Sequence, residues 1–211
     1  MEEYLTVNRE ARVEIIVEKS RFIAYCKRVA SQEEAEEFIS QIRKKHYDAT
    51  HNVPSYRLHA TPLIEKSSDD GEPSGTAGLP ILNLFRQRNI KNVCIVVTRY
   101  FGGIKLGKGG LVRAYAQAAK EALRESGLIS KEIVDVIRVE LAYPLWGRVQ
   151  NELERRGTRV KETLFTDIVS VVLYSKPEET KALIGVLIDL TEGKASIDTG
   201  QQQYLDIEVE L

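Results

Sequence analysis

The spacing of apolar residues divides the first part of the chain into two strands and an amphipathic helix. Two stretches rich in β-branched and aromatic residues, 11–20 and 21–29, predict a pair of strands joined around Lys19 and Ser20. Ser31 is a suitable N-cap for a helix that follows them. The apolar residues that recur at helical spacing, and so predict its buried face, are Ala35, Phe38, Ile39 and Ile42.

A second group of predicted elements follows. Residues 51–60 predict a strand, residues 64–78 a polar, turn-rich loop, and residues 79–85 a helix that packs back on the sheet. Residues 92–98 are almost all apolar, which is typical of a buried strand. A further helix is expected after residue 107, and the residues that predict its apolar face are Val112, Tyr115, Ala116, Ala119 and Leu123.

From about residue 133 the pattern restarts as strand, helix, two strands, helix and strand, which is the βαββαβ order of ferredoxin-like domains. Each of the two predicted helices begins with a proline and ends with a glycine, as helices commonly do. These residues are Pro144 and Gly157 for the first helix, and Pro177 and Gly193 for the second. The six segments are 133–143, 144–157, 158–165, 167–174, 177–193 and 204–211. We therefore predict an α+β protein with two domains, residues 1–135 and residues 136–211.

Composition narrows the class of protein. An apolar fraction of 43% in 211 residues is ample for packed cores. No run approaches the roughly 18 apolar residues of a membrane span, and the N-terminal segment lacks the features of a secretory signal, so no membrane partner and a cytoplasmic location are expected. The net charge of −1 argues against a general polyanion binder. A mild cationic excess lies in residues 1–136, which hold 21 Lys and Arg against 18 Asp and Glu.

The cysteines and histidines predict neither a metal site nor a bound cofactor. Cys26 and Cys94 are far apart and lie inside apolar runs, so reduced core thiols are expected. The three histidines form no ligand-spaced motif with them. His51 and His59 flank one predicted strand and share a face by parity; ordinary surface or capping roles are the favoured interpretation for both.

The segment VTRYFGGIKLGKGGLVRAY, residues 97–115, predicts an anion site at the start of a helix. Residues 102–108 fit the first seven positions of the nucleotide-binding loop G-x-x-x-x-G-K-[ST], but Gly109 stands where the magnesium-binding hydroxyl is needed. Val112 likewise breaks the dinucleotide pattern G-x-G-x-x-G. What remains is a set of glycines and cations without an acid, which suits an anion; a tight turn with solvated cations is the alternative.

A cluster of acids in SSDDGEPSGTAG, residues 67–78, offers a possible second site. Asp69, Asp70 and Glu72 stand beside Ser74 and Thr76. Clustered carboxylates can bind a metal or transfer protons. The favoured alternative is structural: Asp70 with the following glycine is a turn signal, and Ser74 or Thr76 suits a helix cap.

Three long motifs, DATHNVPSYRL, DDGEPSGTAGLPIL and VVTRYFGGIKLGKGGLVRAY, together with KSRF at 19–22, resemble the signature of the Impact family, and the whole chain resembles its bacterial YigZ branch. Val53 departs from the small or sulfur-containing residue that is frequent there. The resemblance implies a first domain with the β-α sandwich fold of a ribosomal protein and of elongation factor domain IV, and a tail similar to domain V. It also implies RNA or the ribosome as partner, although the eukaryotic relatives regulate translation through protein contacts. No reaction is firmly attached to the family.

Three functions follow as hypotheses. The first is binding of RNA or the ribosome, with a regulatory role in translation; the expected contact residues are Arg99, Tyr100, Gly102, Gly103, Lys105, Gly107, Lys108, Gly109, Gly110 and Arg113. The second is an enzyme or binding protein for a small phosphorylated ligand; its additional residues are His51, Asp69, Asp70, Glu72, Ser74 and Thr76. The third is a protein-interaction module. A concave site shared by the acidic and glycine-rich segments favours the second, and a flat basic surface the first.

Overall fold

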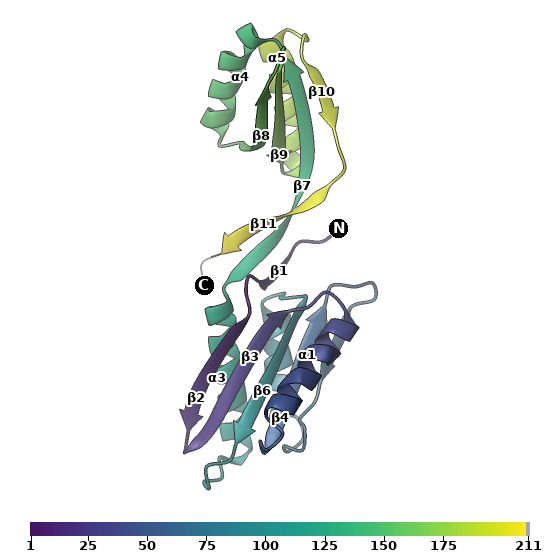
Figure 1. The fold of residues 1–211 in the computed structure, drawn as a ribbon. Coiled ribbons are helices and arrows are strands. Elements are labelled where there is room, and N and C mark those ends of the chain that lie inside the picture. Colours follow the sequence, from purple (N-terminus) through teal and green to yellow (C-terminus); the bar gives the residue numbers. More distant parts are fainter. Residues whose placement is uncertain (210–211) are drawn as a thin grey trace. The chain divides into compact units, whose positions relative to one another are not determined.

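The computed structural model describes residues 1–209 as two compact units. The N-terminal unit comprises residues 4–131 with 206–209, and the C-terminal unit comprises residues 1–3 with 132–205. The structure is mixed α+β, with helices and a sheet in each unit (Figure 1). None of the helices in the described part of the chain has the length and apolar character needed to cross a membrane.

The N-terminal unit is built on a five-stranded antiparallel sheet. Its strands, in spatial order, are β2 (Ala11–Val17), β3 (Ser20–Arg28), β6 (Val93–Tyr100), β4 (His51–Leu58) and β5 (Ile64–Ser67). The turn between β2 and β3 holds Glu18 and Lys19 at φ 46° and 63°. Two successive positive φ values suit a tight hairpin, because their backbone twist matches that of the strands. The predicted strand pair is thus confirmed.

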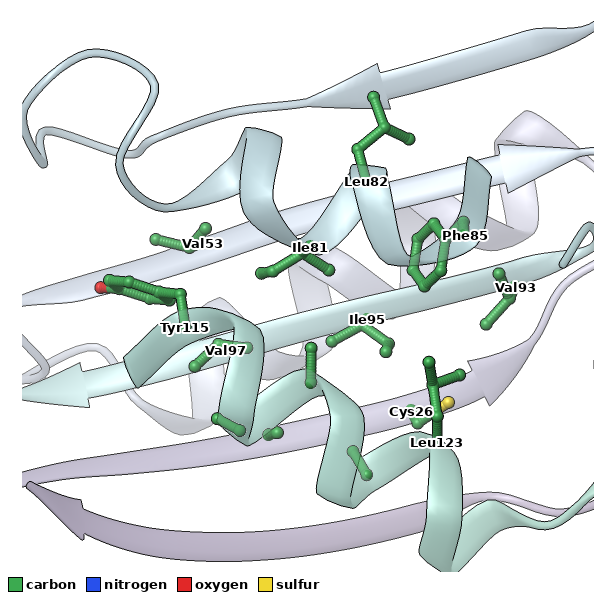
Figure 2. Close-up of a cluster of buried hydrophobic side chains, with 14 of the residues drawn as sticks. Cys26, Val53, Ile81, Leu82, Phe85, Val93, Ile95, Val97, Tyr115 and Leu123 are labelled. Carbon is green, nitrogen blue, oxygen red and sulfur yellow. The ribbon is translucent and has the colours of Figure 1, made fainter. Parts of the chain in front are cut away.

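Helices cover both faces of this sheet (Figure 1). Helix α1 (Gln32–Lys45) covers one face, and its N-cap Ser31 accepts a hydrogen bond from the Glu34 backbone N–H, as predicted. Helices α2 (Gly78–Gln87) and α3 (Gly107–Ser126) cover the other face. Figure 2 shows the core beneath α2 and α3, in which Ile81 and Phe85 meet strand residues such as Ile95. Because both faces are buried, residues 93–97 of β6 form one continuous apolar run.

The buried face of α3 differs in part from the prediction. Tyr115, Ala119 and Leu123 are buried as expected, but Ala116 is only half-buried and Val112 is 37% exposed. The residues that complete the buried face are Leu111, Ala114, Ala118 and Ala122. A face built largely of alanine lets a helix lie close to a sheet, and its small side chains give a weak periodic signal.

The C-terminal unit has the predicted ferredoxin-like order. Its elements are β7 (Leu128–Leu141), whose first four residues belong to the N-terminal unit, α4 (Tyr143–Arg156), β8 (Arg159–Phe165), β9 (Val169–Ser175), α5 (Pro177–Thr191) and β10 (Ser196–Thr199). The strands lie in the spatial order β8, β9, β7, β10. The outer strand β10 was not predicted, because it is only four residues long and most of these residues are polar. The predicted last strand is β11 (Gln203–Val209), which also pairs with β7; residues 210 and 211 of that prediction lie outside the described residues. In the N-terminal unit, a further short strand, β1 (Tyr4–Val7), pairs with residues 128–131 at the start of β7.

Candidate anion-binding site

A pocket of about 380 Å³ lies in the N-terminal unit where the acidic loop meets the glycine-rich segment. Strand register brings the two together: β4 and β6 are antiparallel neighbours in which His51 pairs with Arg99. The acidic loop leads from β5 into α2, and the glycine-rich segment leads from β6 into α3. The residues that line the pocket are Thr50, His51, Glu72, Pro73, Arg99, Phe101, Lys105, Leu106, Gly107, Lys108 and Leu111.

Arg99 and Glu72 form a buried ion pair in the wall of this pocket. The Arg99 Nη1 donates to Glu72 Oε1 at 2.7 Å, and the Tyr115 hydroxyl donates to the same oxygen at 2.7 Å. Arg99 is only 5% exposed, and its guanidinium lies over the rings of Phe22 and Phe101. Burial and the bond to Glu72 raise the pKa of Tyr115, which keeps its hydroxyl a donor. The sequence alone suggested that Arg99 is an exposed cation. The structure shows instead that it is buried and paired.

One nitrogen of the Arg99 guanidinium makes no hydrogen bond within the described part of the chain. Its Nη1 bonds to Glu72 and its Nη2 donates to Ser20 Oγ at 3.4 Å, but its Nε has no hydrogen-bond partner among the described residues. A buried donor without a partner is costly, because it has lost its hydrogen bond to water. Arg99 itself is one of the residues that line the pocket.

His51 presents a proton acceptor to the same space. Its Nδ1 lies 2.7 Å from the backbone oxygen of Asp70, which can only accept, so Nδ1 carries the proton of the neutral ring. The other nitrogen, Nε2, lies 3.7 Å from Glu72 Oε1. His59, by contrast, stacks on Tyr4 after the far end of β4.

The first turn of α3 supplies backbone donors and mobile cations. No side chain caps this helix and its first turn contains no acid, so its N–H groups and the positive end of its dipole are open to an anion. Lys105 and Lys108 are exposed and line the pocket. Within residues 1–209 neither lysine has an ion-pair partner.

The glycines of this segment have different roles. Gly103 and Gly107 have φ values of 86° and 66°, which other residues rarely adopt. A Cβ on Gly102 would lie 2.1 Å from the Lys19 carbonyl carbon, so glycine is needed there for close packing against the β2–β3 turn. Gly109 and Gly110 belong to the first turn of α3.

Of the ten predicted contact residues, Arg99, Lys105, Gly107 and Lys108 line the pocket and the other six do not; Tyr100 and Arg113 are the two of these six that have long side chains. Tyr100 projects to the α1 face of the sheet, where its hydroxyl donates to Asp48 and meets His46 Nδ1. This position separates it from Arg99, since neighbouring residues of a strand point to opposite faces. Arg113 is exposed on α3, and its Nη1 lies 3.6 Å from the place that a Cβ on Gly109 would occupy. It therefore reaches back over the first turn of the helix.

The three acids of the acidic loop have different roles: two hold the loop and the start of α2 in place, and one lines the pocket. Asp69 accepts hydrogen bonds from the backbone N–H groups of Gly75, Ala77 and Gly78. Burial alone would raise the pKa of Asp69, but these three donors together lower it. The carboxylate that caps the start of α2 is thus Asp69, whereas Ser74 and Thr76 were the caps expected from the sequence.

The rest of the acidic loop is held in place by its own contacts. Asp70 accepts from the Asn52 backbone N–H and from Arg43. Thr76 donates to the Pro73 carbonyl, and Ser74 is exposed. Only Glu72 of the three acids lines the pocket. Across residues 1–209 no group of three or more His, Cys, Asp and Glu is arranged to hold a metal ion.

Sequence reasoning missed Tyr115 as a partner of Glu72, because its helical spacing marked it as an ordinary core residue. It also missed Ser20, whose Oγ accepts from both Arg99 and the Gly102 backbone N–H. Both residues are remote in sequence from the motifs that they support.

Comparison with known proteins agrees with the two-unit structure. Residues 18–123 match the Impact N-terminal domain, and residues 139–194 match a domain of unknown function, DUF1949. The chain is 41% identical to the IMPACT family member YvyE of Bacillus subtilis over 203 residues, which is 96% of this chain and 94% of that protein. The chain belongs to the Impact family.

Two further similarities support this assignment. The IMPACT family member YigZ of Escherichia coli is 38% identical over 127 residues, which cover 59% of this chain and 62% of that protein. A solved structure titled "Crystal structure of an hypothetical protein" is 28% identical, with a TM-score of 0.58 over 93% of this chain and 97% of that one. The resemblance seen in the sequence motifs is thus confirmed.

Proposed function

We propose that the N-terminal unit of this Impact family member binds a small phosphorylated ligand in the pocket between the acidic loop and the glycine-rich segment. The observation that carries the proposal is that both segments line one pocket together with Arg99, whose buried Nε has no partner among the described residues. A flat basic surface would have favoured RNA, and the pocket is concave. An uncapped helix start beside two unpaired lysines adds donors and charge suited to phosphate.

The pocket also suits a ligand with an apolar part. Pro73, Leu106 and Leu111 contribute apolar surface, and Phe101 lies at the edge with 47% of its surface exposed. Because Glu72 offsets the charge of Arg99, the net positive charge comes from Lys105 and Lys108. In this proposal the phosphate lies at the first turn of α3 and the apolar part lies against Pro73 and Phe101.

A hydroxyl or water of such a complex would find a proton acceptor in His51 Nε2. This nitrogen faces the pocket beside Glu72, while Nδ1 is held by the Asp70 carbonyl. General-base chemistry on the bound ligand is therefore the enzymatic form of the proposal. It predicts turnover that His51→Gln abolishes while ligand affinity is kept.

RNA binding is the second candidate, and the exposure of Phe101 beside Lys105 and Lys108 favours it. An exposed ring can stack on a base while the lysines contact phosphates. Since Arg99 is paired with Glu72, three exposed cations remain for phosphate contacts: Lys105, Lys108 and Arg113. Three contacts to a single strand predict a slope of about −2 in log K against log salt.

Calorimetric titration separates these candidates. The full chain is titrated with inorganic phosphate, a phosphate monoester such as ribose 5-phosphate, and a short single-stranded RNA without a terminal phosphate. The test variant is Lys105→Gln with Lys108→Gln, and the matched control is Lys120→Gln, an exposed lysine on α3 outside the pocket lining.

We expect the monoester to bind the parent chain and the control equally, and the double variant about tenfold or more weakly, because two charge-assisted hydrogen bonds are lost. If only the RNA binds, with the salt slope given above, the small-ligand proposal is wrong. If the double variant and the control bind the monoester equally, the pocket is not its site.

A further inference from the structure

A second, smaller pocket of about 230 Å³ lies on the opposite face of the same sheet. Ile39 and Arg43 line it from α1, Pro54 and Tyr56 from β4, and Lys66 from β5. Tyr56 packs in the core beneath α1, whereas the anion site opens on the side of Phe22 and Tyr115. No residue lines both pockets.

The hydroxyl of Tyr56 has no hydrogen-bond partner within the described residues, although the side chain is only 1% exposed. Burial raises the pKa of Tyr56, so the hydroxyl stays protonated and is a donor. Tyr115, the comparably buried tyrosine on the other face, donates to Glu72. An unpartnered phenol is thus not the general condition of buried tyrosines in this fold, and the pocket that Tyr56 lines is where an acceptor would fit.

The remaining polar groups of this pocket favour an anionic acceptor. Lys66 Nζ lies 3.2 Å from Glu36 Oε1, but both side chains are largely exposed, so this pair contributes little and leaves the ammonium available. Ser68 Oγ accepts from the Asp70 backbone N–H and retains its own proton for donation. Arg43 is paired with Asp70 at 2.9 Å, which offsets its charge, so the net positive charge of this pocket comes from Lys66.

The size and walls of the pocket favour a short aliphatic ligand. Its volume is below the range that holds drug-sized ligands, and Ile39 and Pro54 give it an apolar wall. We propose that this pocket binds a small carboxylate, with one oxygen accepting from the Tyr56 hydroxyl, the charge near Lys66, and a short alkyl group against Ile39 and Pro54. This site is independent of the proposed phosphate site.

The test is an NMR titration of the ¹⁵N-labelled full chain with sodium propionate, and separately with inorganic phosphate, at constant ionic strength. We expect the backbone amides of Lys66, Ser67 and Ser68 to shift saturably with propionate. Tyr56→Phe removes the donor and should weaken propionate binding about tenfold, as expected for one hydrogen bond to a charged group. The matched control is Tyr25→Phe, which also removes a phenol on the α1 face, but one that contacts Arg12 and His46.

Thermal stability gives a second readout. Because the Tyr56 hydroxyl has no partner in the fold, Tyr56→Phe should melt at an equal or higher temperature than the parent chain, whereas Tyr25→Phe should melt lower. Equal propionate affinity of Tyr56→Phe and the parent chain would overturn the proposal. Equal shifts with phosphate and propionate would overturn the assignment to carboxylates and leave a general oxyanion site.

Discussion

Replacing Glu72 by Gln tests the buried ion pair that forms the wall of the anion site. The two side chains are 4% and 6% exposed, so the Arg99 charge would lose its partner in a place that water does not reach. Breaking a buried pair on one side costs about 3–5 kcal/mol. The Gln oxygen can still accept from Arg99 or Tyr115, so we expect the lower end, about 3 kcal/mol, which is a large part of a typical domain stability.

Urea unfolding followed by far-UV circular dichroism measures this change. With a typical dependence on urea, 3 kcal/mol lowers the midpoint by about 1.5 M. The only tryptophan, Trp146, lies in the C-terminal unit, so its fluorescence reports on the unit that lacks Glu72. The matched control is Glu14→Gln, because Glu14 also pairs with arginine side chains, Arg12 and Arg21, but at the surface. It should cost less than about 1 kcal/mol. Equal destabilisation by the two substitutions would refute the importance of the buried pair.

Two further predictions concern the loops that shape the site. Asp69→Asn should destabilise the protein by about 2 kcal/mol at pH 7, because backbone donors prefer the carboxylate. Since the folded pKa of Asp69 lies below its ordinary value of 3.8, its stabilising effect is present above that pH and is lost as the pH falls through the folded pKa. Unfolding curves between pH 2 and 7 should therefore converge at the acid end, and a constant difference would contradict this role. Gly102→Ala places a methyl group against the Lys19 backbone and should cost about 2 kcal/mol or more in urea unfolding. In contrast, Gly185→Ala, in open space on α5, should be neutral or stabilising by up to about 1 kcal/mol.

Local patterns predicted most elements because they depend on neighbouring residues. The spacing of Phe38 and Ile42, and the capping chemistry of Ser31, are properties of one turn of helix. The ferredoxin-like order was predicted from the same periodicities. Strand β10 was not predicted, because its sequence SIDT is short and does not alternate apolar with polar residues.

Which residues meet in the candidate site was harder to predict from the sequence, because it depends on strand order and register. Nothing local indicates that β6 lies between β3 and β4, which is what sets Arg99 opposite His51. For the same reason Arg99 was expected among exposed cations, although Glu72 neutralises it from a loop 27 residues earlier. Asp69 caps α2 although it lies eight and nine residues before its partners Ala77 and Gly78. Capping rules consider only residues next to the helix start, so they could not predict this contact.

The most direct test of the central claim is an amide NMR titration of the full chain with ribose 5-phosphate and inorganic phosphate, read at the first turn of α3. If the pocket binds phosphate as proposed, the amides of Gly107, Lys108, Gly109 and Gly110 shift saturably, together with the Arg99 Nε–H, and Lys105→Gln with Lys108→Gln weakens the response while Lys120→Gln does not. Shifts that fail to saturate with either ligand, or that avoid both Arg99 and the start of α3, would contradict the account.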